Sequence, residues 1–232
     1  MKRLSSLVIA AGLVAAGPAH AQVTATASAN NPNFTTANPV NNGTYSKLSF
    51  YSDFSANSSR FSPSLFYATS DTPNYNVAPA GDTTRYAFVA PNPVTGAPGN
   101  TPSVFSTAGL DPFDTVSLLW GSIDSFNTVS FLSGSTVLKA FSGSDFYTGA
   151  ARNGLDTRYV SFRLDPSLVG QVTGISFASN GANAFEFDNF ALGSAVPEVT
   201  TWAMMILGMG MTGGAMRRWR LRRRVNFVMV RA

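Results

Sequence analysis

The sequence predicts an all-β fold, a two-sheet antiparallel β-sandwich of jelly-roll type, with an N-terminal signal helix and a single C-terminal transmembrane helix. Three observations predict the sandwich. Many short stretches alternate apolar and polar residues, which is the period of a half-buried strand. Glycine and asparagine separate these stretches at turn positions. Between the two ends no segment carries a long apolar repeat of three to four residues, so helix is expected to be minor there.

The first 21 residues have the pattern of a signal peptide. Lys2-Arg3 supplies positive charge, residues 4–16 are apolar, and Ala19-His20-Ala21 places small residues around a signal-peptidase site. A retained anchor is the alternative, but the apolar stretch is shorter than the ~20 residues of a spanning helix. We therefore expect signal peptidase to cleave after Ala21, so that the mature chain begins at Gln22.

The following segments differ in composition. Residues 22–46 are rich in Asn, Thr, Ala and Pro without an apolar period, which predicts a flexible leader or a loosely attached strand. Residues 47–195 are expected to form one β-sandwich ectodomain of ordinary size. Prolines interrupt residues 69–102 so often that only residues 85–90 are predicted to form a strand there.

The remaining strands show clear alternation. Val116, Leu118 and Trp120 share one face, and Thr115 and Ser117 lie on the other, so Trp120 is expected in the core. Residues 159–164 alternate in the same way. Two strand pairs are predicted around glycine-containing turns, namely 128–132 with 136–141 and 173–178 with 184–192.

The C-terminal end combines a short motif, an apolar stretch and a basic block. The motif residues Pro197, Glu198 and Trp202 come just before residues 203–216. That stretch carries no charge. A helix over residues 199–216 would be about 27 Å long, enough for a thin bilayer core. Arginines are kept on the cytoplasmic side of a short span. Those expected to act as the cytoplasmic stop are Arg217, Arg218, Arg220, Arg222, Arg223 and Arg224.

This end resembles the PEP-CTERM sorting signal, in the variant where the Pro-Glu-Pro motif is followed by Trp-Ala-Met-Met-Ile, a glycine-rich span and arginines. Pro197-Glu198 and residues 202–206 carry the match, so residues 196–224 are predicted to be the sorting signal. In that family the membrane protease exosortase removes the tail and passes the protein to the cell surface or matrix. The resemblance thus implies exosortase as a partner.

Two features depart from that family's pattern. Val199 stands where the second proline is usual, and residues 225–232 extend the chain beyond the arginines. A single proline fixes an extended backbone less well than a pair. A permanent single-span anchor without processing is therefore the alternative.

The ectodomain resembles a family of exosortase-dependent bacterial surface proteins over residues 103–195. The resemblance rests on residues 120–129, 141–146 and 184–190. It implies a surface-displayed β-sandwich and no particular catalytic activity.

Composition excludes several function classes. Nine of the sixteen Lys and Arg residues lie in the two terminal segments, which leaves seven against the chain's twelve acidic residues, of which all but Glu198 lie in residues 22–195. Nucleic acid is not an expected partner, because phosphate binding rests on clustered basic residues. The chain has no cysteine, and its one histidine, His20, lies in the signal peptide. Disulfides, thiolate metal sites and Ser-His-Asp chemistry are therefore excluded for the mature protein.

Glu186 and Asp188 are the main candidates for a site. They lie two residues apart on a predicted strand, so their side chains share a face, where Asp124 could complete an oxygen cage for calcium. The simpler interpretation is that Phe185 and Phe187 pack inward and both acids are solvated. No dense Asp-x-Asp-x-Asp loop accompanies them, so no cofactor is expected, with calcium as the alternative.

These observations predict an exported protein without enzymatic activity. We expect it to pass through the inner membrane with its C-terminus in the cytoplasm and to reach the cell surface or extracellular matrix. There it would have a structural or adhesive role that includes polysaccharide binding. The alternative is a glycan-active enzyme, which requires two carboxylates about 5 to 9 Å apart, but the spacing of the acids singles out no such pair.

Overall fold

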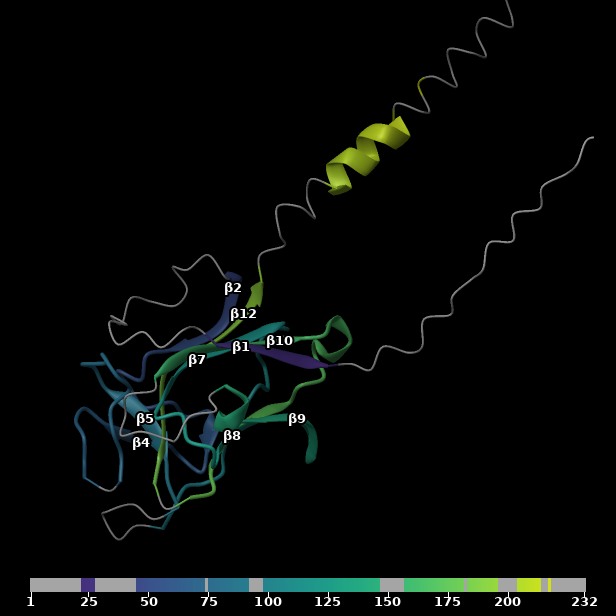
Figure 1. Cartoon of the computed structure of the whole chain (residues 1–232). Coiled ribbons are helices and arrows are strands. Elements are labelled where there is room, and N and C mark those ends of the chain that lie inside the picture. The colour runs from purple at the N-terminus through teal and green to yellow at the C-terminus, as the bar shows by residue number, and fades with distance from the viewer. Residues whose placement is uncertain are drawn as a thin grey trace, which may run out of the picture.

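The chain folds into two antiparallel β-sheets (Figure 1). The computed structural model describes residues 22–27, 45–73, 75–91, 98–146, 157–181, 183–195, 204–213 and 217. Sheet A has seven strands in the order β1-β10-β7-β12-β5-β4, with β2 also paired to β12, and sheet B has five in the order β3-β6-β11-β8-β9. The coarse prediction of a mostly β chain with two antiparallel sheets is confirmed.

The strands are short, as the turn spacing predicts. Sheet A consists of β1 (Val23–Ala27), β2 (Tyr45–Ser52), β4 (Phe66–Ala68), β5 (Tyr86–Val89), β7 (Thr115–Gly121), β10 (Arg158–Leu164) and β12 (Phe185–Ala195). Sheet B consists of β3 (Phe61–Ser62), β6 (Ser103–Ser106), β8 (Asn127–Ser133), β9 (Thr136–Ser142) and β11 (Gly174–Ser179). Within the described part of the domain, helix is limited to two 3-10 turns, η2 (Gly143–Asp145) and η3 (Pro166–Leu168).

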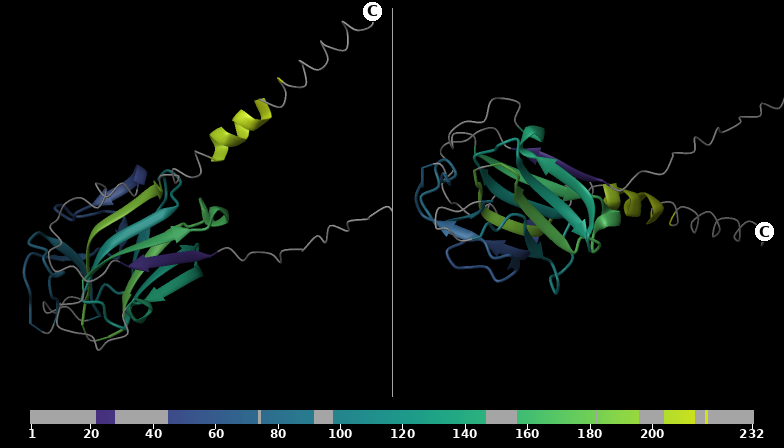
Figure 2. Two further views of the ribbon diagram at one scale, coloured as in Figure 1. Left: turned by 45° about the horizontal axis from the view of Figure 1, so that its top comes forward. Right: turned by 90° about the horizontal axis from the view of Figure 1, so that it is seen from below.

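Aromatic side chains from both sheets meet in one core, between the layers seen in Figure 2. Phe177 of β11 stacks on Phe187 of β12 with ring centroids 4.5 Å apart and planes at 7°. Trp120 is fully buried and stacks on Phe185 at 4.5 Å, which confirms that it is a core residue. Aromatic pairs of this kind add about 0.5–1.5 kcal/mol beyond their burial, so they hold the two sheets in a fixed relation.

One of the two predicted strand pairs is confirmed and the other is wrong. β8 and β9 pair as a hairpin, and Gly134 supplies the positive φ of 58° that its turn needs. β11 and β12, however, do not pair, because β11 lies between β6 and β8 in sheet B while β12 lies in sheet A. The chain crosses from one layer to the other between them, which allows the stack of Phe177 on Phe187.

The assignment of residues 22–46 as a flexible leader is wrong for Val23–Ala27. These residues form β1, which pairs with β10 along its whole length, and Val23 is buried. This outcome matches the alternative, an attached strand. Residues 28–44 lie outside the described part of the chain.

Sheet A is covered on the side away from the core. Thr115 and Ser117, which alternation placed on the other face of β7, are buried as well. Part of the cover comes from residues 69–73 and 75–84, called here the covering segment. Its Pro79 lies so close to Gly121 of β7 that a Cβ there would come within 2.9 Å of the proline, so a side chain at this position would push the segment away.

The described tail residues 204–213 are helical. No helix in the described ranges is long and apolar enough to cross a membrane. The predicted span extends over residues 199–216, of which 199–203 and 214–216 lie outside those ranges. The signal-cleavage residues Ala19 and Ala21, the motif residues Pro197, Glu198 and Trp202, and all stop arginines except Arg217 also lie outside them.

We expect Phe177→Ala to lower the free energy of unfolding by about 3–5 kcal/mol, because it empties a fully buried ring position between the sheets. Urea unfolding followed by tryptophan fluorescence measures this loss. Val137→Ala is the control, since Val137 is 56% exposed on β9 and its truncation should cost less than about 0.5 kcal/mol. Equal losses in the two variants would contradict a core between the sheets.

Candidate functional site

A β-bulge in the centre of β12 places two acidic side chains on the covered face of sheet A. The register of β12 against β7 shifts between Asp188 and Ala191, and Asn189 has a φ of 51°. Asparagine tolerates this left-handed conformation better than most residues. Phe187 and Phe190 therefore both reach the core, while Asp188 lies on the opposite face.

Glu186 is buried beneath the covering segment, with 2% of its surface exposed. Its Oε1 accepts a hydrogen bond of 2.9 Å from the backbone N–H of Val77, whereas its Oε2 is buried without a partner. Burial raises the pKa of this carboxyl well above its ordinary value, and the charges of Asp124 and Asp71 add to the rise. Burial therefore favours the neutral form of the Glu186 carboxyl, and its hydrogen bond to Val77 anchors the segment.

Asp188 is fully buried and lies beside Asp82 of the covering segment. Burial raises the pKa of Asp188 to about 9, and the neighbouring carboxylates of Asp82 and Asp53 contribute. The Thr84 hydroxyl lies 2.7 Å from Asp82 Oδ1 and 3.4 Å from Asp188 Oδ2. The two carboxyls hydrogen-bond to each other, and beyond this contact Asp82 Oδ2 and Asp188 Oδ1 are buried without a partner among the described residues.

An open pocket is connected to the bulge of β12 through Tyr51. Tyr51 and Asp53 line it together with residues 55–60, and its volume is about 360 Å³. The Tyr51 hydroxyl donates a 2.8 Å hydrogen bond to Asn189 Oδ1 on the bulge. Burial, together with the charges of Asp53 and Asp188, raises the pKa of Tyr51 to about 12. Tyr51 therefore remains neutral and connects the pocket to the bulge.

Glu186 and Asp188, predicted with Asp124 as a calcium cage, have different acidic neighbours in the structure. Glu186 and Asp188 share a face as predicted, and Phe185 and Phe187 pack inward. The interpretation that both acids are solvated is wrong, because the covering segment buries them. The charge of Asp124 contributes to the raised pKa of Glu186. The acidic side chain beside Asp188 is instead that of Asp82, which contributes to the raised pKa of Asp188. In the ranges that the structure describes, no group of three or more acidic or histidine side chains could hold a metal ion.

Sequence reasoning missed Asp82. A local signal existed, since Asp82 Oδ1 also accepts a 2.8 Å hydrogen bond from the Thr84 N–H, a turn that Asp-x-Thr favours. Nothing in the sequence, however, indicated that Thr84 would meet a residue 104 positions later in the chain. That contact arises from the way the segment folds over sheet A.

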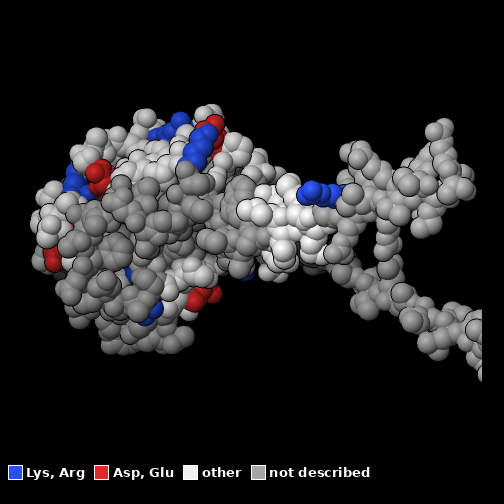
Figure 3. Space-filling model, turned by 90° about the horizontal axis from the view of Figure 1, so that it is seen from above, with Lys and Arg blue, Asp and Glu red and all other residues white. Residues whose placement is uncertain are grey.

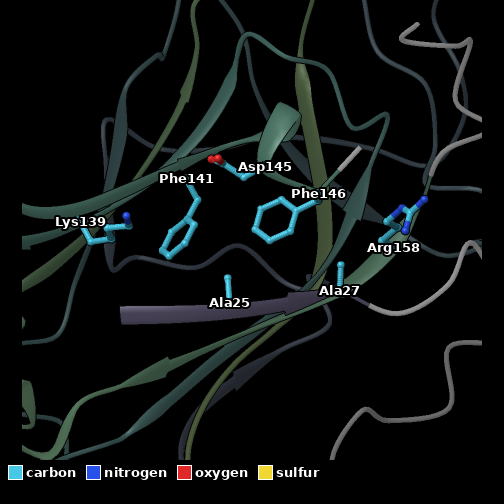
Figure 4. Close-up of a pocket in the computed structure, with 7 residues that line it drawn as sticks. All are labelled: Ala25, Ala27, Lys139, Phe141, Asp145, Phe146 and Arg158. Atoms are coloured by element: carbon cyan, nitrogen blue, oxygen red, sulfur yellow. The ribbon is translucent and has the colours of Figure 1, made fainter. Parts of the chain in front are cut away.

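A second candidate site is a groove at the open edge of the two layers. It lies between β1 and β9, the end strands of sheets A and B, and has a volume of about 350 Å³. Figure 4 shows two aromatic rings side by side within it, with basic side chains toward both ends and Asp145 between them. The ammonium of Lys139 lies 5.3 Å from the ring centroid of Phe141. The groove is lined by Ala25, Ala27, Lys139, Phe141, Asp145, Phe146 and Arg158.

Without divalent cations, the free energy of unfolding should fall as the pH rises from about 5 to about 8. In this window Asp188 is protonated in the folded state, because its pKa is about 9, but ionised in the unfolded chain, where the value is 3.8. Unfolding thus releases a proton, and stability falls by up to about 1.4 kcal/mol per pH unit. The raised pKa of Glu186 also makes the free energy of unfolding fall as the pH rises. Below the lower pKa and above the higher one, Asp188 has the same charge in both states and its effect is constant.

Urea unfolding at several pH values measures this slope. Asp188→Asn should reduce it, whereas Asp111→Asn, at an exposed ion pair with Lys47, should leave it unchanged. The pKa of Asp53 is lowered by a hydrogen bond from the Ser55 N–H, so its stabilisation is lost only at more acidic pH. A wild-type stability that rises between pH 5 and 8 would contradict the buried acids.

No family model, curated protein or solved structure matches this chain. A functional assignment therefore rests on its own residues, above all on the buried acids of β12 and the groove between β1 and β9.

Proposed function

We propose that this chain is an exported surface protein, sorted by exosortase, whose two sheets form a jelly-roll sandwich that binds polysaccharide at the groove between β1 and β9. Signal peptidase removes residues 1–21, and the C-terminal segment holds the chain in the inner membrane until it is processed. The mature domain then remains at the cell surface or in the extracellular matrix. The observation that carries this proposal is the uncharged helical segment that follows the last strand.

That segment exposes apolar side chains to an unusual degree. Residues 204–213 contain six large apolar side chains that are 45–68% exposed. The transfer of such a surface from water into hydrocarbon is favourable, with a free energy of roughly 25 cal/mol per Å² of apolar area. The arginines that follow in the sequence would stay on the cytoplasmic side. The six residues are Met204, Met205, Ile206, Leu207, Met209 and Met211.

Among the described residues, one face of the domain lacks the basic patch that nucleic-acid binding requires (Figure 3). In the view of Figure 3, the coloured Lys, Arg, Asp and Glu side chains are few and scattered, with no continuous basic patch among the described residues on that face. Phosphate binding requires such a patch. A ligand that binds through apolar and local polar contacts fits this surface better.

The groove has the features of a sugar-binding surface. The half-buried Phe146 offers aromatic area for the apolar face of a sugar ring, and the buried Phe141 beside it supports the floor of the groove. Lys139 and Arg158 outnumber Asp145, so the groove is more basic than the acidic domain around it. We therefore expect an acidic polysaccharide, one that carries carboxylate groups, to bind better than a neutral one.

The enzyme alternative has weaker support. The acid pair in direct contact, Asp82 and Asp188, is buried by the covering segment. A polysaccharide chain cannot reach Asp188, which has no exposed surface. Paired carboxylates that hydrolyse glycosides must contact the substrate, so this pair does not suit that role.

Lys139→Ala should weaken binding of an acidic polysaccharide roughly 2–5-fold, because an exposed charge contact contributes about 0.5–1 kcal/mol. Affinity electrophoresis or calorimetry with alginate, and with a neutral glucan for comparison, measures the change. Lys47→Ala is the matched control, because Lys47 is exposed outside the groove. Failure to bind any matrix polysaccharide, with or without calcium, would remove the binding part of the proposal.

Mass spectrometry of the mature C-terminus tests the sorting part. Cells that contain the sorting protease should yield a chain without the apolar stretch, and cells that lack it should yield the intact tail. Glu198→Ala should leave the tail intact in both, whereas Thr201→Ala, which lies outside the matched motif residues, should be processed normally. An intact tail in wild-type cells would instead indicate a permanent anchor.

A further inference from the structure

Two carboxyl groups from distant parts of the chain meet inside the protein. Asp82 belongs to the covering segment and is 8% exposed, and Asp188 belongs to β12 and is 0% exposed. The Thr84 hydroxyl lies within hydrogen-bond distance of both. The two carboxyls also hydrogen-bond to each other through the proton that the raised pKa of Asp188 retains, but no other group among the described residues reaches Asp82 Oδ2 or Asp188 Oδ1.

A shared proton is the one occupant that the described residues offer these two oxygens. A buried polar atom without a partner is rare in folded proteins, and adjacent carboxylates also repel each other. A cation between the two groups would remove both penalties at once, since it would partner the free oxygens and neutralise the charges. We propose that Asp82 and Asp188, with the Thr84 hydroxyl beside them, bind a calcium ion.

The chemistry of the donors favours calcium over other metals. All the side-chain ligands are oxygen atoms. Zinc and copper prefer nitrogen or sulfur ligands, so this set does not favour them. Two carboxylates balance the double positive charge. Calcium accepts six to eight oxygens in flexible geometry, whereas magnesium requires a near-ideal octahedron. Asp53, which acts electrostatically on Asp188, lines an open pocket together with Tyr51.

The surrounding charges also favour a cation. Asp53 acts electrostatically on both Asp188 and the Tyr51 hydroxyl. Its own pKa is lowered, so it is negatively charged at neutral pH. Without the ion, a proton occupies the site instead, because the pKa of Asp188 is about 9. Calcium must displace this proton, so calcium binding should be accompanied by the release of a proton.

Calcium binding can be measured on the full-length chain, purified in detergent and stripped with EDTA. Titration with calcium chloride at pH 7 should show one site, and thermal unfolding should move to higher temperature as calcium is added. Calorimetry in buffers of different ionisation enthalpy should show release of about one proton per ion. Magnesium chloride at equal concentration should have a much smaller effect.

Three variants locate the ion. Asp188→Asn and Asp82→Asn should each weaken calcium binding at least tenfold, without loss of the fold, because each removes a buried charge. Asp111→Asn should bind calcium like the wild type, since Asp111 lies at an exposed ion pair. Should an Asn variant fail to fold, Thr84→Val keeps both carboxylates and should still weaken binding measurably.

Two results would overturn the proposal. One is a wild-type chain whose unfolding temperature does not change up to 10 mM calcium, which would leave a shared proton as the only occupant. The other is a calcium response of equal size in the wild type and in the variants at Asp82, Asp188 or Thr84. Glu186→Gln is informative as well: a loss of binding there and not at Asp82 would place the ion elsewhere on β12.

Discussion

The burial of β12 on both faces is the constraint on which the rest of the structure depends. One face carries Phe185, Phe187 and Phe190, which are fully buried in the core between the sheets. The other carries Glu186 and Asp188, which are just as deeply buried. A strand buried on both faces is normally apolar throughout. Here the second face is acidic, so the covering segment must supply hydrogen bonds and the carboxyls must hold protons or a cation.

This arrangement explains why the covering segment has a defined position although it contains little regular structure. Its backbone N–H at Val77 bonds to Glu186, and its Ala80 N–H bonds to Thr157 Oγ1 at 2.6 Å. The carbonyl of Tyr75 accepts a 3.0 Å bond from the Ala184 N–H. The partners are Glu186 of β12 and the residues that directly precede β10 and β12, so the segment is fixed by contacts along its length. An apolar face on β12 could not have oriented its backbone in this way.

The alternation of apolar residues predicted the strands well, because it reflects the geometry of a single strand. It located β7, β10 and the β8–β9 hairpin within a residue or two of their observed bounds. It could not predict which strands pair, since a compact turn at Asn180-Gly181 fits a hairpin and a crossing between layers equally well. It also could not show that Glu186 and Asp188 are buried. The segment that buries them is proline-rich and has no period of its own, and Asp82 contacts Asp188 only through the tertiary fold.

The two candidate sites differ in how far the sequence predicts them: alternation predicts the strands of one, whereas only the tertiary fold brings the residues of the other together. The groove between β1 and β9 lies at the edges of both sheets, where the exposed side chain of Lys139 can change without disturbing the core. Its residues come from strands that alternation predicts. The acid pair lies in the centre, and a change there affects the attachment of the covering segment. The groove therefore suits recognition, and the acid pair suits the maintenance of the fold.

The position of β12 also bears on how the proposed sorting would work. β12 is the last strand in sequence but a central strand in sheet A, where it pairs with β2, β5 and β7. It ends at Ala195, two residues before Pro197. Sheet A therefore cannot be completed until nearly all of the chain before the tail is available to fold. A tail that holds this end at the membrane keeps β12 outside the cytoplasm while its neighbours assemble around it. Removal of the tail after the motif leaves every residue of β12 in place, so a processed domain loses the anchor but none of the contacts that stabilise it.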